Sequence, residues 1–319
     1  MQAMAENMHN ESDHSVLDAP RIRTIALDAG YSSVNLYDEV DSTTTRAREL
    51  LMDGSDPERE QLGELSVYAS LYQSAGRGRL ARAWTAPPGA CLAASIVVRP
   101  HASTDPLARE LPEDSYHWLT LIAGLSVVDI WRSYGVDAAL KWPNDVLVDG
   151  ARKICGILAQ LAPASSPFTT SAILGYGINI AQDCDHLATP QATSLYVEGD
   201  TEAGADPTSV SHTLLAQILT GLDSRIRGLV THGNARDCGL ADEAANALPL
   251  LGTRIALAKP TDPNGHPAME GVALGLSPTG SLLVATDDGR THDISAGDVL
   301  ATGIPLTTVH DTKEKRANN

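Results

Sequence analysis

Residues 73–84 read Gln73-Ser74-Ala75-Gly76-Arg77-Gly78-Arg79-Leu80-Ala81-Arg82-Ala83-Trp84, with three arginines and two glycines within seven positions. Glycine lets the backbone approach a ligand closely, the planar arginine guanidinium fits carboxylate and phosphate oxygens, and an indole stacks on flat rings. In a chain whose formal net charge is −17, this cationic stretch indicates a loop that closes over a nucleotide or an activated acid. The alternative is a solvated surface loop. Neither a Walker loop nor a dinucleotide fingerprint is present in the sequence.

Two apolar runs flank this loop and are predicted to be β-strands. Apolar residues alternate over 65–72, whereas 91–98 is more continuously apolar. Further strands are predicted at 36–40, 138–142, 146–148, 154–161 and 171–178. A short helix is predicted near Pro20, and the N-cap residues Asp41 and Ser42 predict a helix after them. The spacing of apolar residues predicts two longer helices, over 116–134 and over 210–230. Residues 181–207 are rich in turn-forming residues, and we expect them to be irregular.

The composition changes near Leu248. From 252 to 301, short apolar runs alternate with glycines, a pattern typical of a small β-barrel. We therefore expect a disordered tail over 1–20, a large domain over 21–247, a small β domain over 248–303 and a mobile tail over 304–319.

Bulk composition excludes several classes of protein. The sequence pI of about 4.8 argues against general affinity for nucleic acid, and no run approaches the roughly 20 apolar residues of a membrane helix. Residues 1–20 lack the order of a signal peptide. The four cysteines are widely separated, so neither a disulfide framework nor a zinc site is indicated. We expect reduced thiols and a cytoplasmic location.

A second motif runs over 141–145, as Lys-Trp-Pro-Asn-Asp, and continues over 153–156, as Lys-Ile-Cys-Gly. Pro143 stiffens a turn between two predicted strands, and the Asn-Asp pair after it can hold the turn. Lys153 leads into a buried strand, where little water would screen its attraction to a carboxylate or phosphate. The two interpretations are a hairpin with lysines on its rim and an anion-binding site.

Two further motifs also have a structural and a functional interpretation. The stretch 175–179, Gly-Tyr-Gly-Ile-Asn, places two glycines in a strand, which indicates a bulge or the close approach of another group. The stretch 41–44, Asp-Ser-Thr-Thr, is typical of a helix N-cap. Its hydroxyls and exposed amides can also bind a neutral polar ring, such as a ureido group.

The order and spacing of these motifs resemble the biotin–protein ligases. The shared pattern, from about Asp38 to Val299, is Asp-Ser-Thr, Gln-x-x-Gly-Arg-Gly-Arg-x-x-Arg-x-Trp, Lys-Trp-Pro-Asn-Asp-Val, Lys-x-x-Gly-Ile-Leu and Gly-x-Gly-x-Asn. The resemblance implies an α+β fold, in which a mixed-sheet catalytic domain of the biotin/lipoate ligase type spans 21–247. It also implies a small SH3-like β-barrel over 248–303.

The resemblance also implies an activity, that of biotin–[biotin carboxyl carrier protein] ligase (EC 6.3.4.15). Such enzymes use ATP and Mg²⁺ as co-substrates to convert biotin into biotinyl-5′-AMP, and then transfer biotin to a lysine of a biotin carboxyl carrier domain. No tightly held cofactor is expected. The implied state is a monomer or weak homodimer that binds neither nucleic acid nor membrane.

Site residues carry over by their position in the motifs. Arg77 and Lys153 would be the catalytic cations. The biotin site would be formed by Ser42, Thr43, Thr44, Gln73, Arg77, Gly78, Arg79, Lys153 and Gly156. The ATP or adenylate site would be formed by Arg79, Arg82, Trp84, Asn144, Asp145 and Asn179, with Trp84 covering the adenine. The resemblance names no magnesium ligands.

Two positions depart from the family pattern. Thr44 stands where the family usually has asparagine, which removes an amide contact. Ala81 stands where the loop often has glycine, which stiffens the loop because alanine resists positive φ.

Two alternative functions remain at this point. A lipoate–protein ligase or octanoyl transferase shares the catalytic fold, but the Arg-Gly-Arg loop with Trp84 favours biotin. A DNA-binding biotin sensor would carry an N-terminal helix-turn-helix of about sixty residues. Only about 35 residues precede Asp38, and the chain is acidic, so we expect the monofunctional form.

Overall fold

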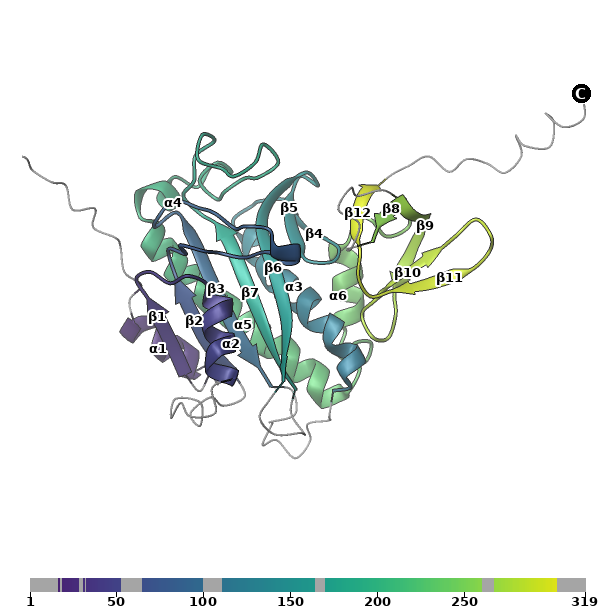
Figure 1. Ribbon diagram of the computed structural model, residues 1–319, viewed down its shortest axis with the longest axis horizontal. Coiled ribbons are helices and arrows are strands. Elements are labelled where there is room, and N and C mark those ends of the chain that lie inside the picture. The colour runs from purple at the N-terminus through teal and green to yellow at the C-terminus, as the bar shows by residue number, and fades with distance from the viewer. Residues whose placement is uncertain are drawn as a thin grey trace, which may run out of the picture.

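The computed structural model describes residues 17, 19–28, 31, 33–52, 65–99, 111–163, 170–259 and 267–302. The chain forms a larger part around a seven-stranded sheet and a smaller part around a five-stranded sheet, beside the β4 edge of the larger one (Figure 1). The tail predicted over 304–319 and residues 1–16 of the tail predicted over 1–20 lie outside the described residues. Leu17 is buried, and the first helix begins at Ala19.

The larger sheet has the strand order β1-β2-β3-β7-β6-β5-β4. The β1 and β2 strands are parallel, and every other neighbouring pair is antiparallel, so the predicted mixed sheet is confirmed. The strands are β1 (Ser33–Tyr37), β2 (Leu65–Ser70), β3 (Cys91–Val98), β4 (Ala138–Lys141), β5 (Asp145–Val148), β6 (Arg152–Pro163) and β7 (Thr170–Asn179).

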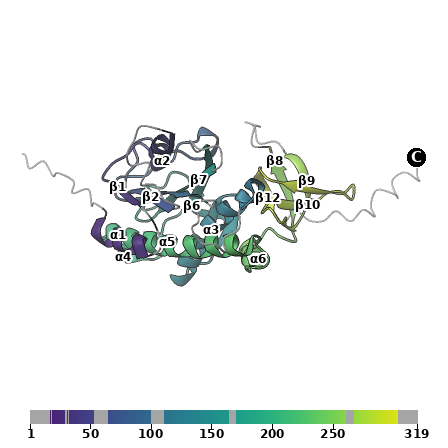
Figure 2. The ribbon, with the colours of Figure 1, turned by 90° about the horizontal axis from the view of Figure 1, so that it is seen from below.

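Helices cover both faces of this sheet (Figure 2). The α2 helix (Thr43–Met52) lies on one face and packs Ala47, Leu50 and Leu51 onto strands β2, β3 and β7. The opposite face is covered by α1 (Ala19–Asp28), α3 (His117–Ser133) and α5 (Pro207–His232). The structure therefore has a three-layer arrangement in which buried aliphatic side chains fill both interlayer spaces.

The β2 strand differs from its sequence pattern. Alternation over 65–72 indicates a half-buried strand, yet residues 66–70 are all buried. Ser66 and Ser70 face a helix-covered side even though they are polar, because β2 lies inside a sheet covered on both faces. The buried Ser70 hydroxyl has a hydrogen-bond partner, because it donates to Tyr72 O at 2.8 Å.

The smaller part is an antiparallel sheet with the order β11-β10-β9-β8-β12, which confirms the small C-terminal β domain. Its strands are β8 (Arg254–Ala258), β9 (Pro267–Leu276), β10 (Leu282–Ala285), β11 (Thr291–Ile294) and β12 (Asp298–Thr302). It packs on the larger part through Trp118 of α3, whose Nε1 donates to Pro278 O at 2.9 Å.

Two short helices and two 3-10 turns were not predicted from the sequence. The α4 helix (Thr201–Ala205) lies within the segment expected to be irregular, and α6 (Leu240–Ala247) follows α5. Both are too short for a clear apolar period. The 3-10 turns are η2 (Arg79–Ala81) and η3 (Glu113–Tyr116). Among the helices described, none has the length and apolarity needed to cross a membrane.

Candidate active site

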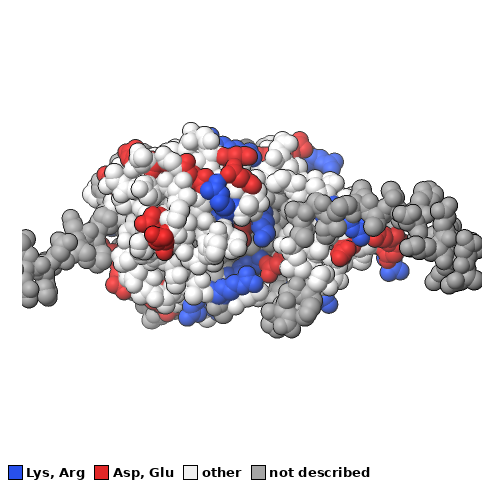
Figure 3. Space-filling model, turned by 90° about the horizontal axis from the view of Figure 1, so that it is seen from above, with Lys and Arg blue, Asp and Glu red and all other residues white. Residues whose placement is uncertain are grey.

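The motif residues meet at a cavity of about 280 Å³ between the arginine-rich loop, β6, β7 and the start of β12. Lys and Arg side chains gather beside a hollow on the face shown in Figure 3. Every site residue named from the sequence lines this cavity except Ser42, which lines an adjoining open hollow. The cationic lining residues are Arg77, Arg79, Arg82 and Lys153, and the carboxylates are Asp145 and Asp298.

The arginine-rich loop is a narrow backbone hairpin. Trp84 N donates to Gly76 O at 2.9 Å, and Gly78 N donates to Arg82 O at 2.8 Å. Leu80 at its tip is half-exposed and has a φ of 55°, a left-handed conformation that is unfavourable for a leucine. The positive φ therefore falls on Leu80, not on Ala81, where the sequence departs from the family pattern.

One end of the cavity is polar and uncharged. Ser42 caps α2, because its hydroxyl accepts from Thr45 N at 3.3 Å. Thr43 N donates to Gln73 Oε1 at 2.8 Å, and the hydroxyls of Thr43 and Thr44 lie 2.8 and 2.9 Å from Ser95 Oγ. These groups can exchange hydrogen bonds with a small neutral ring. The sequence motifs did not include Ser95, which is one polar residue within an apolar strand.

Glycines in β7 provide space for neighbouring side chains. A Cβ on Gly175 would lie 2.6 Å from Thr44 Oγ1, and one on Gly177 would lie 2.5 Å from Trp84 Cε2. The pairing of β7 with β3 and β6 has no register shift. Of the two interpretations of this motif, close approach is therefore correct and a bulge is not.

Trp84 forms the floor of the other end of the cavity. Its Nε1 donates to Cys91 Sγ at 3.4 Å, and its ring lies over Gly177. Burial raises the pKa of the Cys91 thiol to about 11, and burial also raises the pKa of Cys155. Both thiols are consequently protonated at neutral pH and are poor nucleophiles.

Lys153 projects into the cavity from β6. Its Nζ lies 2.7 Å from Asp145 Oδ1 and 5.5 Å from the centre of the Trp84 ring. A Cβ on Gly156 would lie 3.0 Å from that ammonium, so the glycine leaves room for it. The ammonium is thus placed between the aromatic floor and the carboxylate.

Arg79 connects the loop to both parts of the molecule. Its Nη1 donates to Asn144 Oδ1 at 2.7 Å and to Asp298 Oδ1 at 3.1 Å. Asn144 in turn donates to Ile157 O at 2.7 Å. Arg82 is mostly exposed, with its Nη2 3.8 Å from Asp298 Oδ2. Among the described residues, Arg77 has no side-chain partner, and it is exposed at the cavity rim.

Asn179 lines the cavity but directs its amide toward the loop that follows β7. Its Nδ2 donates to Thr193 O at 2.9 Å, and its Oδ1 accepts from Gln182 Nε2 at 3.0 Å. This loop contributes Ala188, Thr189 and Ala192 to the cavity wall. Sequence reasoning missed these residues and Asp298, because they belong to no motif with recognisable spacing.

No group of three or more His, Cys, Asp or Glu side chains that could hold a metal occurs within the described ranges. Asp145, the carboxylate beside Lys153, is already ion-paired. The cavity therefore does not form a resident metal site from the described protein ligands alone.

Comparisons with known proteins agree with this geometry. Residues 39–179 match the Biotin/lipoate A/B protein ligase family, and residues 261–300 match the Biotin protein ligase C terminal domain. The Biotin--[acetyl-CoA-carboxylase] ligase of Mycobacterium tuberculosis is 34% identical over 73% of this chain and 78% of that protein. The protein of the same name from Paracoccus denitrificans is 31% identical over 72% of this chain and 88% of that protein.

The fold is also similar to solved structures. A biotin protein ligase from Aquifex aeolicus, in complex with biotin and ATP, superposes with a TM-score of 0.55 at 23% identity, over 85% of this chain and 97% of that one. At this identity the likeness concerns the fold alone. The matched family models and the two sequence relatives lead to one conclusion: the chain belongs to the biotin protein ligase family.

Proposed function

We propose that this chain joins biotin to ATP as biotinyl-5′-AMP and then transfers the biotinyl group to one lysine of a carrier domain of acetyl-CoA carboxylase. The observation that carries the proposal is the polarity of a single cavity. Thr43, Thr44 and Gln73 supply an uncharged polar end that suits a ureido ring. Arg77, Lys153 and Trp84 supply a cationic and aromatic end that suits a carboxylate and a nucleotide.

In the first step, a biotin carboxylate oxygen attacks the α-phosphorus of ATP and pyrophosphate leaves. Two anions must approach each other, so their repulsion is the main obstacle. Arg77, Arg79 and Lys153 line the cavity and can neutralise both groups and the charge that builds on the phosphoryl oxygens. Holding the reactants in line contributes roughly 7–11 kcal/mol in favourable cases.

Arg79 would change partners when the nucleotide binds. In the structure its guanidinium is held by Asn144 and Asp298. A phosphate oxygen would compete with Asp298 for the same planar group, since both are anionic acceptors. Arg77 needs no such exchange and is the arginine we expect to contact the adenylate first.

In the second step, the neutral amine of the acceptor lysine attacks the carbonyl carbon of the mixed anhydride, and AMP leaves. The amine loses a proton as the amide forms. No covalent enzyme intermediate is required, and the raised pKa values of the Cys91 and Cys155 thiols agree with their taking no part.

Magnesium would enter with the nucleotide. Mg²⁺ usually keeps several waters and binds substrate phosphates with one or two carboxylates. Asp145 is the carboxylate placed to bind that magnesium ion, once ATP competes with it for Lys153.

A cytoplasmic location agrees with the four free cysteines, and a monomer or weak homodimer stays our expectation.

The test is biotin-dependent exchange of labelled pyrophosphate into ATP, with mass detection of bound biotinyl-AMP. Parallel reactions receive lipoate or octanoate in place of biotin, and a further reaction receives the carrier domain in its unbiotinylated form. We expect pyrophosphate exchange with biotin but not with lipoate or octanoate. We also expect the carrier domain to carry biotin on one lysine after the reaction. Exchange driven by lipoate or octanoate, with none from biotin, would contradict the proposal.

A further inference from the structure

Arg152 and Lys153 are neighbours at the start of β6, so their side chains point to opposite sides of the strand. Lys153 points into the cavity, toward Asp145. Arg152 points away from it, and its guanidinium contacts Glu198 Oε1 at 2.6 Å and Asp149 Oδ2 at 2.6 Å. An anchor on Arg152 therefore also fixes which way Lys153 faces.

The backbone of Lys153 is held by the loop that follows β7. Lys153 N donates to Gln191 O at 2.6 Å, and Thr193 N donates to Lys153 O at 2.8 Å. The backbone N–H and C=O of Lys153 are thus both hydrogen-bonded to a segment almost forty residues further along the chain. Any shift of this loop would move the Lys153 backbone with it.

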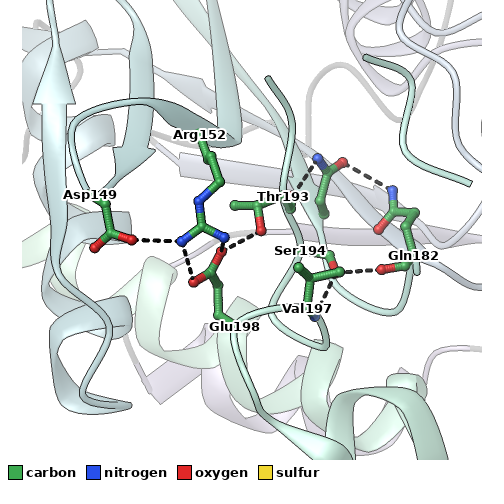
Figure 4. Close-up of polar contacts among 8 residues, drawn as sticks. Asp149, Arg152, Gln182, Thr193, Ser194, Val197 and Glu198 are labelled. Carbon is green, nitrogen blue, oxygen red and sulfur yellow. Dashed lines mark hydrogen bonds and ion pairs between the residues drawn. The ribbon is translucent and has the colours of Figure 1, made fainter. Parts of the chain in front are cut away.

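Glu198 connects these two sets of contacts (Figure 4). The Thr193 hydroxyl donates to Glu198 Oε1, and Arg152 Nη2 donates to Oε2 at 3.0 Å. The Glu198 side chain is only 10% exposed, and Thr193 is fully buried. Charge-assisted bonds of this kind are stronger when water is excluded.

We infer that Glu198, through Thr193 and Arg152, is a positioning residue that holds Lys153 in place for the adenylate. It touches no reacting atom. It fixes the loop that binds the Lys153 backbone and the arginine that sets the direction of the Lys153 side chain. The inference rests on the proposed function, since it assumes that Lys153 contacts the bound anhydride.

A double-mutant cycle separates positioning from general stabilisation. We would measure by calorimetry the dissociation constant of an acyl-sulfamate analogue of biotinyl-AMP for wild type, Glu198→Gln, Lys153→Ala and the double variant. We expect Glu198→Gln to weaken binding by about tenfold in the presence of Lys153 and to have no further effect in its absence. An equal loss in both backgrounds, or no loss at all, would overturn the inference.

A second pair of variants removes the concern that Glu198→Gln simply fails to fold. Thr193→Val keeps the shape of the side chain but removes the hydroxyl, so we expect it to weaken analogue binding as Glu198→Gln does. Thr193→Ser keeps the hydroxyl and should bind the analogue like wild type. If Thr193→Val also binds like wild type, the hydroxyl does not act through Glu198 and the inference is wrong.

A matched control comes from another carboxylate that binds an arginine. Glu243 contacts the largely buried Arg225 between α5 and α6 and does not line the cavity. Glu243→Gln should lower the melting temperature without changing analogue binding. Failure of the proposed function would be recognised separately, because wild type would then show neither analogue binding nor biotin-dependent pyrophosphate exchange.

Discussion

Lys153 is the single side chain on which the proposed adenylation depends most directly. Lys153→Ala removes the ammonium 2.7 Å from Asp145 while leaving a strand residue that still pairs with β5. We expect pyrophosphate exchange to fall by about 100-fold or more, the usual cost of removing one preorganised charge donor. The melting temperature should change little, because the side chain is one-third exposed.

The control for Lys153→Ala is Arg290→Ala, which removes a cation from an exposed turn of the C-terminal domain. It should leave exchange unchanged. Exchange by Lys153→Ala at the wild-type rate would contradict the proposed role.

The role of Trp84 as the surface on which adenine stacks can be tested by adding one methyl group at Gly177. Gly177→Ala would place a Cβ about 2.5 Å from the indole and force the ring away. Base–aromatic stacking contributes about 1–3 kcal/mol, so we expect the KM for ATP to rise about tenfold. Gly275→Ala is the matched control, because nothing lies within 4 Å of its added Cβ. Equal KM values for the two variants would exclude Trp84 as the adenine platform.

Burial of the Cys91 thiol should make the free energy of unfolding decrease at alkaline pH. Burial raises the pKa of this thiol from 9.0 to about 11, so the folded state keeps a proton that the unfolded state loses. This contribution is fully present below pH 9 and is lost as the pH rises through 11, a total change of about 3 kcal/mol. Chemical denaturation at pH 9 and 11 should show a smaller drop for Cys91→Ala than for wild type. The exposed Cys184→Ala should behave like wild type.

At the scale of elements, the arginine-rich loop is the segment we expect to respond to ligand. It is held by a few backbone hydrogen bonds and by the contacts of Arg79 with Asn144 and Asp298, while Leu80 at its tip is half-exposed. A bound adenylate would supply a partner for Arg77 and stabilise the closed form.

Hydrogen exchange tests this loop directly. The peptide covering residues 76–83 should gain protection when biotin and ATP are added together. The β3 peptide, residues 91–98, is buried in both states and should remain protected throughout. If the loop is equally protected with and without ligand, it does not act as a gate, although the ligase activity would be unaffected by that result.

At the scale of the whole molecule, the two parts are joined where Gly280 meets Trp118. Gly280 has a φ of +88°, and a Cβ there would lie 3.0 Å from Trp118 N. Gly280→Ala combines a left-handed penalty of about 1–2 kcal/mol with a clash between domains. Gly289→Ala has the same penalty at a φ of +82° with open space around it.

Thermal unfolding followed by tryptophan fluorescence separates the two effects. We expect Gly280→Ala to melt at a lower temperature than Gly289→Ala and its tryptophan emission to change at a lower temperature, because Trp118 is 1% exposed in the native state. Identical melting curves for the two variants would indicate that this contact does not couple the domains.

Local pattern was sufficient for most elements and for the cavity's motif residues. Apolar spacing identified α3 and α5, because amphipathic periods reflect which face is buried, and the N-cap residues identified α2. Glycine and arginine content identified the loop. The strand predicted over 65–72 is confirmed as β2, but alternation did not predict that helices on both faces bury its polar and apolar positions alike. The pattern was silent on α6.

Local sequence was therefore enough to predict the strands and longer helices, the chemistry of the arginine-rich loop and the family, but not α4 and α6. The partners that those residues contact follow from the three-dimensional packing. Ser95 lies among the hydroxyls of Thr43 and Thr44, and Asp298 reaches Arg79 across 219 positions. Glu198 likewise joins Arg152 across 46 positions. Such contacts depend on strand register and domain packing, which bring together residues whose separation along the chain carries no periodic signal.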